Sequence, residues 1–154
     1  MIETKKDLIK IKNYLDNFNQ KQIKLYLSCI NECPFEGKIN KKIIIDEIKW
    51  HYENIKPDIL CLSDTCGTLT NDEFINIIDN CKVPYNLLGI HLHFDKNNEI
   101  EVVNILKTCF DRKIKYYDVS LIESGGCSLT INNPKKNLTY DLFNKTLDEY
   151  LQLL

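Results

Sequence analysis

The sequence contains no alanine, one arginine and five glycines in 154 residues, while lysine, isoleucine and asparagine are abundant. This bias is typical of an AT-rich coding sequence and carries no chemical information. No apolar run approaches the roughly 20 residues that cross a bilayer, so no membrane-spanning helix is expected. No proline- or serine-rich linker and no low-complexity stretch divides the chain, which predicts one domain over residues 1–154.

Charge and cysteine usage exclude further classes of protein. The net charge of −2 and the pI near 5.9 argue against a nucleic-acid partner. The charged amino-terminal segment is typical of a helix start and not of a signal peptide, so we expect a cytoplasmic protein. The seven cysteines lack the regular spacing of a disulfide framework and the double Cys-x2-Cys spacing of a zinc cluster. Cys61, Cys81 and Cys109 lie at apolar positions and are expected to be reduced core residues.

Short apolar segments alternate with longer amphipathic segments along the whole chain. Strands are expected at 23–29, 58–63, 87–93 and 115–121, and helices at 5–18, 41–55, 70–80, 98–112 and 139–154. Thr70 and Glu73 have the spacing of a capping box at the start of the third helix. Strands that alternate with helices pair in parallel through right-handed crossovers, so an α/β fold is predicted.

His91 and His93 close the third predicted strand, Leu87–His93. Side chains at positions i and i+2 of a strand point to the same face, so both imidazoles can reach one metal ion. The alternative is a pair of partly buried histidines that only make hydrogen bonds.

Polar residues follow each of the other predicted strands as well. They are Ser28 and Cys29, then Ser63, Asp64 and Thr65, and finally Ser120 with the loop Gly125-Gly126-Cys127. Functional groups gathered after parallel strands are typical of the TIM barrel. Four βα units preceded by a helix make half of such a (β/α)8 barrel.

Several of these segments together resemble the carboxyl half of the 3-hydroxy-3-methylglutaryl-CoA (HMG-CoA) lyases. The matching segments, in family order over about residues 23–145, are Ser28–Ile39, Leu62–Gly67, Gly89–His93, Tyr117–Ser120, Ser124–Cys127 and Asn137–Leu142. The string Cys33-Pro34-Phe35-Glu36-Gly37-Lys38 and the Gly-Gly-Cys loop are specific to the lyase among its relatives.

The resemblance implies a metal-dependent cleavage of HMG-CoA to acetyl-CoA and acetoacetate, as in leucine degradation and ketone-body formation. By this resemblance His91 and His93 bind a divalent cation, Mg²⁺ or Mn²⁺, with Asn137 as third ligand. The spacing from Cys127 is one residue longer than in the family, so Lys136 is the alternative occupant of that third position.

The resemblance also assigns three residues around the substrate. Cys127 is the expected acid/base catalyst, carried by a glycine-flanked loop. Asp64 and Thr65 are expected to line the acyl-CoA site, although an Asp-Thr pair at this position can also cap a turn.

The amino-terminal half-barrel of the family has no counterpart here, nor has its Arg-Asp pair, which supplies a metal ligand and an electrophilic arginine. A half-barrel has two open sheet edges, and open edges pair with other chains. We therefore expect either a homodimer or a complex with a separate amino-terminal half-barrel chain. The alternative function is that of a non-catalytic relic that binds an acyl-CoA or a partner.

Overall fold

The computed structural model describes residues 2–18, 22–122 and 135–154 of the chain. Within these residues no helix is both long and apolar enough to cross a membrane.

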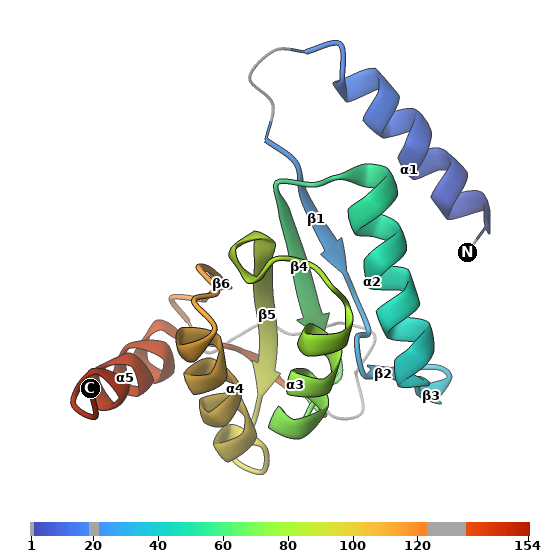
Figure 1. Cartoon of the computed structure of the whole chain (residues 1–154). Helices are drawn as coiled ribbons and strands as arrows, with labels where there is room; N and C mark the ends of the chain where they lie inside the picture. Colours follow the sequence, from blue (N-terminus) through green and yellow to red (C-terminus); the bar gives the residue numbers. More distant parts are fainter. Residues whose placement is uncertain (1, 19–21, 123–134) are drawn as a thin grey trace.

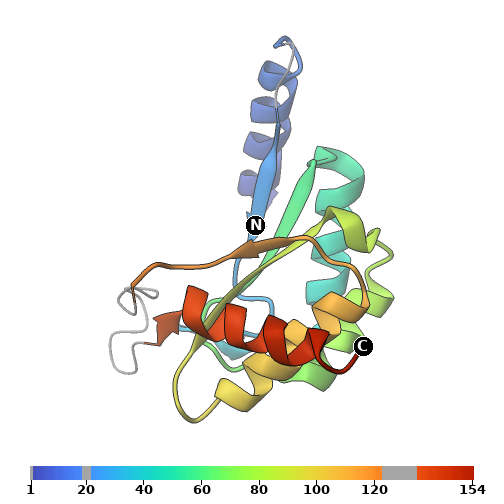
Figure 2. The same ribbon diagram turned by 90° about the vertical axis from the view of Figure 1, so that its left-hand side faces the viewer.

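A parallel sheet with the strand order β1-β4-β5-β6 forms the centre of the molecule (Figure 1). Its strands are β1 (Lys24–Leu27), β4 (Ile59–Asp64), β5 (Leu88–Phe94) and β6 (Tyr116–Asp118). The crossover helices are α2 (Lys41–Ile55), α3 (Asn71–Asn80) and α4 (Glu99–Asp111). Figures 1 and 2 show these helices on one face of the sheet. The predicted half of a TIM barrel is thus confirmed.

The remaining elements flank this unit. They are α1 (Ile2–Leu15), the antiparallel pair β2 (Glu32–Cys33) and β3 (Gly37–Lys38), the 3-10 turn η1 (Tyr85–Leu87), β7 (Lys136–Asn137) and α5 (Tyr140–Leu151). Strand β7 pairs antiparallel with the end of β5. The sequence pattern predicted α1 and α5, but neither the short β2–β3 pair nor β7, because two-residue strands have no periodicity to detect.

The face of the sheet that carries the helices is apolar. Leu60 and Leu62 of β4 and Leu88, Ile90 and Leu92 of β5 are all at most 1% exposed. The residues between them are Cys61, Gly89 and His91, so these five apolar side chains all point to the face that carries the helices. Cys81 and Cys109 are fully buried in this core as free thiols, and Cys61 is also a buried free thiol, as predicted.

Helix caps agree with the sequence as well. The hydroxyl of Thr70 accepts from the amide of Glu73, and the carboxylate of Glu73 accepts from the amide of Thr70. Asn40 and Thr139 cap α2 and α5 in a similar way. Because each cap satisfies amides that the helix leaves unpaired, these three helices begin where their capping residues stand.

The opposite face of the sheet is polar and strongly concave. Lys24 of β1 forms an ion pair with Asp118 of β6, although β4 and β5 lie between these two strands. Neighbouring strands are about 4.8 Å apart, so side chains can meet across two intervening strands only if the sheet curves toward this face. Gly89 of β5 favours the close approach, since a Cβ there would lie 3.2 Å from side-chain atoms of both Ile59 and Tyr116.

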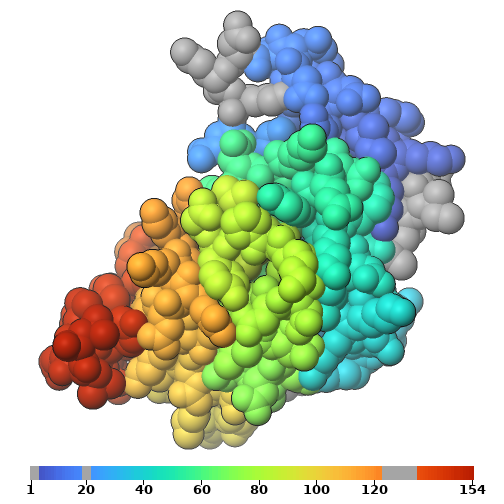
Figure 3. Space-filling view, viewed as in Figure 1, coloured from blue at the N-terminus to red at the C-terminus, as the bar shows by residue number. Residues whose placement is uncertain are grey.

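Helix α1 packs beside α2 at the β1 edge of the molecule. The ammonium of Lys5 lies 2.7 Å from a carboxylate oxygen of Glu47 and 4.5 Å from the centre of the Trp50 ring. Figure 3 shows α1 lying along the upper part of α2, with α3, α4 and α5 continuing the helical surface. The β6 end of the sheet carries α5, and the β1 end carries α1.

Candidate functional site

The two predicted histidines lie together at the carboxyl end of β5. His91 and His93 share one face of the strand, and their ring centres are 4.8 Å apart with an angle of 79° between the ring planes. The carboxyl ends of parallel strands are where α/β folds place their ligands. The i, i+2 spacing therefore brings the rings together as the sequence predicted.

The protonation of His93 follows from its contact with β4. Its ring is buried, and Nδ1 lies 2.8 Å from the main-chain oxygen of Asp64. Because a carbonyl oxygen can only accept, Nδ1 must carry the hydrogen. The lone pair of neutral His93 is then on Nε2, which is the arrangement that metal-binding histidines use.

The surroundings of His91 favour its neutral form. Burial and the neighbouring His93 lower the pKa of His91, while the nearby carboxylate of Asp118 opposes them. Its Nδ1 is buried and lies 3.3 Å from Oδ2 of Asp118, but the two groups lack the alignment of a full hydrogen bond. Neutral imidazole is the form that binds metal, so the environment of His91 favours a ligand.

The register of β7 distinguishes the two candidates for a third ligand. Asn137 lies directly opposite His93 in the antiparallel pair, and Lys136 lies opposite Phe94. Opposed residues in such a pair point to the same face of the sheet. Asn137 therefore shares the face of the histidines, and the exposed Lys136 points the other way.

Asp64 and Thr65 are both engaged in the loop that follows β4. The carboxylate of Asp64 is 1% exposed and accepts from the amides of Thr68 and Leu69, at 3.2 and 3.0 Å. Burial raises the pKa of Asp64, although these amides oppose the shift. The hydroxyl of Thr65 accepts from the amide of Cys29, at 3.0 Å. Both side chains shape the turn, and their contact with a substrate stays a prediction.

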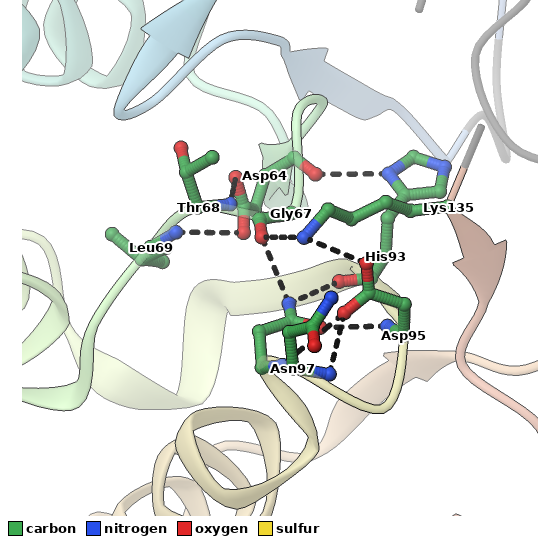
Figure 4. A network of polar contacts seen from close by, with 9 residues as sticks. Asp64, Gly67, Thr68, Leu69, His93, Asp95, Asn97 and Lys135 are labelled. Carbon is green, nitrogen blue, oxygen red and sulfur yellow. Dashed lines mark hydrogen bonds and ion pairs between the residues drawn. The ribbon is translucent and has the colours of Figure 1, made fainter. Parts of the chain in front are cut away.

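A rim of polar contacts surrounds this loop (Figure 4). The ammonium of Lys135 lies 3.0 Å from the main-chain oxygen of Gly67 and 3.3 Å from a carboxylate oxygen of Asp95. The amide group of Asn98 donates to the main-chain oxygens of Gly67 and His93. These contacts connect the ends of β4 and β5 to the segment that enters β7.

Sequence reasoning missed Lys135, because a lysine in a polar loop carries no signal of burial. It also assigned no role to Asp118, Lys24 or Tyr26. The alternation of polar and apolar residues in β1 and β6 was the available signal, since it puts these three side chains on the face of the histidines.

Two findings determine which of the predicted residues are available to bind a metal ion at this site. Cys127 lies outside the described residues. Within the described ranges, no group of three or more His, Cys, Asp or Glu side chains is arranged to hold a metal ion. The available donors are thus the ring nitrogens of His91 and His93 and the amide oxygen that Asn137 can offer. Imidazole nitrogens suit transition-metal ions and amide oxygens suit Mn²⁺ and Mg²⁺, so this mixed set is compatible with Mn²⁺ and is less suited to Mg²⁺.

Comparison with known proteins identifies the fold. No protein-family model and no curated protein sequence matches the chain significantly. Among solved structures, the HMG-CoA lyase of Brucella melitensis superposes with a TM-score of 0.81 at 21% identity, over 96% of this chain and 51% of its own. The chain has the fold of an HMG-CoA lyase half-barrel.

Two further solved lyases match in the same way. The HMG-CoA lyase of Bacillus subtilis gives a TM-score of 0.76 at 19% identity, over 93% of this chain and 47% of its own. The enzyme of Acinetobacter baumannii, solved with coenzyme A and 3-methylmalate, gives 0.75 at 20% identity, over 92% and 45%. The chain therefore spans about half the length of each lyase, and these identities bear on the fold alone.

Proposed function

We propose that the chain is the carboxyl half of a metal-dependent lyase that cleaves HMG-CoA to acetyl-CoA and acetoacetate. The observation that carries this proposal is the pair of adjacent histidine rings at the end of β5, with Nδ1 of His93 directed at a main-chain oxygen, on the fold of an HMG-CoA lyase. The Nδ1 hydrogen of His93 is committed to Asp64, which leaves its Nε2 lone pair for a ligand.

In this proposal His91, His93 and Asn137 hold Mg²⁺ or Mn²⁺. The bound cation would lower the pKa of the substrate hydroxyl and orient the bond that breaks. Asp64 acts through its main-chain oxygen, which keeps the His93 ring oriented. The side chains of Asp64 and Thr65 shape the floor of the substrate site.

Cys127 is proposed as the acid/base catalyst. It would protonate the departing enolate of acetyl-CoA. The substrate is proposed to be an acyl-CoA, because the Acinetobacter lyase was solved with coenzyme A and a hydroxy acid. If the acyl-CoA is HMG-CoA, the proposed reaction belongs to leucine degradation and ketone-body formation. The cytoplasmic location stays a prediction.

A complementary half-barrel fits the open edges better than a second copy of this chain. The described residues form five α-helices and four barrel strands. A closed barrel has one helix per strand, but two copies would bring ten helices to eight strands. Helix α1 of one copy and α5 of the other would then have to cover the same groove. A partner with four strands and three helices avoids this conflict.

The β1 edge offers space for such a partner. A cavity of about 750 Å³ lies between α1, β1 and α2, with Leu8, Leu27 and Ile43 among its lining residues. Ile11 and Tyr14 of α1 and Phe18, just after this helix, also form an apolar surface, and each is at least half exposed. An added strand beside β1 would fill this space and cover apolar surface.

The test is complementation. The chain is mixed with the amino-terminal half of an HMG-CoA lyase, which carries the Arg-Asp strand, and acetoacetate release is measured. The mixture should turn over HMG-CoA, and the chain alone should be slower by a factor on the order of 10² to 10³ for each missing stabilising group.

Two variants make the result specific. Cys127→Ser should abolish the complemented activity and leave the complex intact, whereas Cys109→Ser, in the buried core, should affect folding and not the proton transfer. A complex that forms but never releases acetoacetate would overturn the lyase proposal and favour the alternative, a relic that binds acyl-CoA or a partner without turnover.

A further inference from the structure

Asp118 lies at the centre of a charged cluster on the concave face of the sheet. Its carboxylate forms an ion pair with the ammonium of Lys24 and accepts from the hydroxyl of Tyr26, at 2.8 Å. The thiol of Cys61 lies 3.9 Å from the same carboxylate, and Nδ1 of His91 lies 3.3 Å from it. The four barrel strands thus each contribute a side chain, and one carboxylate contacts them all.

This carboxylate is fixed in position and in charge. Lys24 and Tyr26 approach it from β1, across the concavity, while the backbone of Asp118 is paired with His91 in β6 and β5. The ion pair with the Lys24 ammonium favours the ionised form of this carboxylate. An ionised carboxylate can only accept hydrogen bonds.

The two histidines therefore face acceptors of different kinds. Nδ1 of His93 meets a main-chain oxygen, that of Asp64, which no substitution of the side chain removes. Nδ1 of His91 meets a side-chain carboxylate. The same ring nitrogen is directed toward an acceptor in each residue, so the same nitrogen, Nε2, is left for a ligand in each.

We propose that Asp118, anchored by Lys24 across the half-barrel, is the positioning residue that sets the tautomer and orientation of His91. The proposal deepens the proposed function, since its purpose is to present Nε2 of His91 beside Nε2 of His93. A small rotation of the His91 ring completes the hydrogen bond, because the two atoms are already 3.3 Å apart. Asp118 acts through His91 and has no role in contacting the substrate.

Nitrogen NMR of the metal-free chain tests the proposal directly. Three histidines give a simple spectrum, and a protonated ring nitrogen is readily distinguished from one with a lone pair. In the wild type, His91 should carry its hydrogen on Nδ1. In Asp118→Asn, the form with the hydrogen on Nε2 should become populated for His91, while His93 stays unchanged because its acceptor is main chain.

The chain offers a matched control. Asp111 accepts from the hydroxyl of Tyr150 at 2.7 Å, much as Asp118 accepts from Tyr26, but it lies on the exposed surface of α4. Asp111→Asn should leave the tautomers of all three histidines unchanged. Lys24→Met keeps the carboxylate but removes its anchor, so it should shift the His91 tautomer less than Asp118→Asn does.

Titration with Mn²⁺ supplies the second readout. Loss of such a supporting carboxylate typically costs about 10- to 100-fold in metal affinity, and this is the loss expected for Asp118→Asn. A hydrogen on Nε2 of wild-type His91, or an unchanged tautomer in a folded Asp118→Asn, would overturn the proposal. A tautomer shift in a chain that binds no Mn²⁺ would support the positioning role and reject the proposed metal site, so the two failures are distinguishable.

Discussion

The central strands and the edge strands of this sheet differ in how deeply their residues are buried. Every residue of β4 is buried, and β5 is buried except for His91, whose side chain is 28% exposed, whereas no residue of β1 or β6 is buried. The central strands carry the histidines and the carbonyl that orients one of them. The edge strands carry the supporting cluster of Lys24, Tyr26 and Asp118. The half-barrel thus buries the strands in the middle of the candidate site and leaves those at its edges partly exposed.

The largest predicted loss of stability is for a leucine-to-alanine substitution in a central strand, compared with the same substitution in an edge strand. Leu62 of β4 and Leu27 of β1 are register partners on the same apolar face, and only Leu62 is fully buried. Leu62→Ala should lower the free energy of unfolding by about 3–4 kcal/mol, because it leaves a cavity in a packed core. Leu27→Ala should cost about 1 kcal/mol.

Urea unfolding of both variants measures the difference. If a complementary half-barrel covers the β1 edge, its addition should raise the cost of Leu27→Ala and leave that of Leu62→Ala unchanged. Equal costs in the isolated chain would show that β1 is as well packed as β4, contrary to the comparison.

A glycine at the rim of the site should give the second largest effect. Gly67 and Gly37 both have positive φ, +61° and +74°. A Cβ on Gly67 would meet the Lys135 side chain at 2.4 Å and the His93 main-chain oxygen at 2.8 Å, whereas one on Gly37 meets no atom within 4 Å. Gly67→Ala should cost about 2–3 kcal/mol, from backbone strain and collision together, and Gly37→Ala about 1 kcal/mol.

Thermal unfolding of these two glycine variants provides the check. Combining Gly67→Ala with Lys135→Ala should restore only part of the lost stability, because the collision of the new Cβ with the His93 main-chain oxygen persists. Identical melting temperatures for the two single variants would contradict the close packing of Lys135 and the His93 main chain around Gly67.

The smallest effect concerns an ion pair between the β2–β3 pair and α3. Burial raises the pKa of Glu73, but Lys38, at 2.8 Å, and the Thr70 amide outweigh it and hold this pKa at about 2. A carboxylate with a depressed pKa in the folded state stabilises the fold above its unfolded pKa. That stability is lost as the pH falls from about 4.5 toward 2.

Glu73→Gln should therefore cost about 1 kcal/mol at neutral pH and nothing near pH 2. Unfolding measured from pH 7 to pH 2 checks this, with Glu99→Gln at the start of α4 as a control of equal charge change. A constant difference between wild type and Glu73→Gln over this pH range would refute the assignment.

The parts of the fold that the sequence predicts are those with a local cause. Strand and helix periodicity, the Thr70 cap and the shared face of His91 and His93 all follow from residues within a few positions of one another. The choice between Asn137 and Lys136 could not be made by counting from Cys127, because the length of a loop does not determine how the next strand pairs.

Contacts between residues far apart in the sequence could not be predicted from the periodicity of polar and apolar residues either. The Asp118 cluster depends on the curvature of four strands, which brings Lys24 to a residue 94 positions away. Lys135 is buried because Gly67 leaves room for its side chain. Nothing in the sequence near either residue predicts that the two are in contact. Such contacts depend on tertiary packing and not on local preference.

Metal binding tests the central claim, a ligand site at the carboxyl end of β5, most directly. Calorimetric titration with Mn²⁺ should give a weak one-to-one site in the wild type, weak because His91, His93 and Asn137 supply only three ligands and no carboxylate. The heat should vanish in His91→Ala and in His93→Ala and persist in His51→Gln, whose ring contacts the Glu47 main-chain oxygen within α2. Identical titrations for the wild type and the two β5 variants would contradict the account.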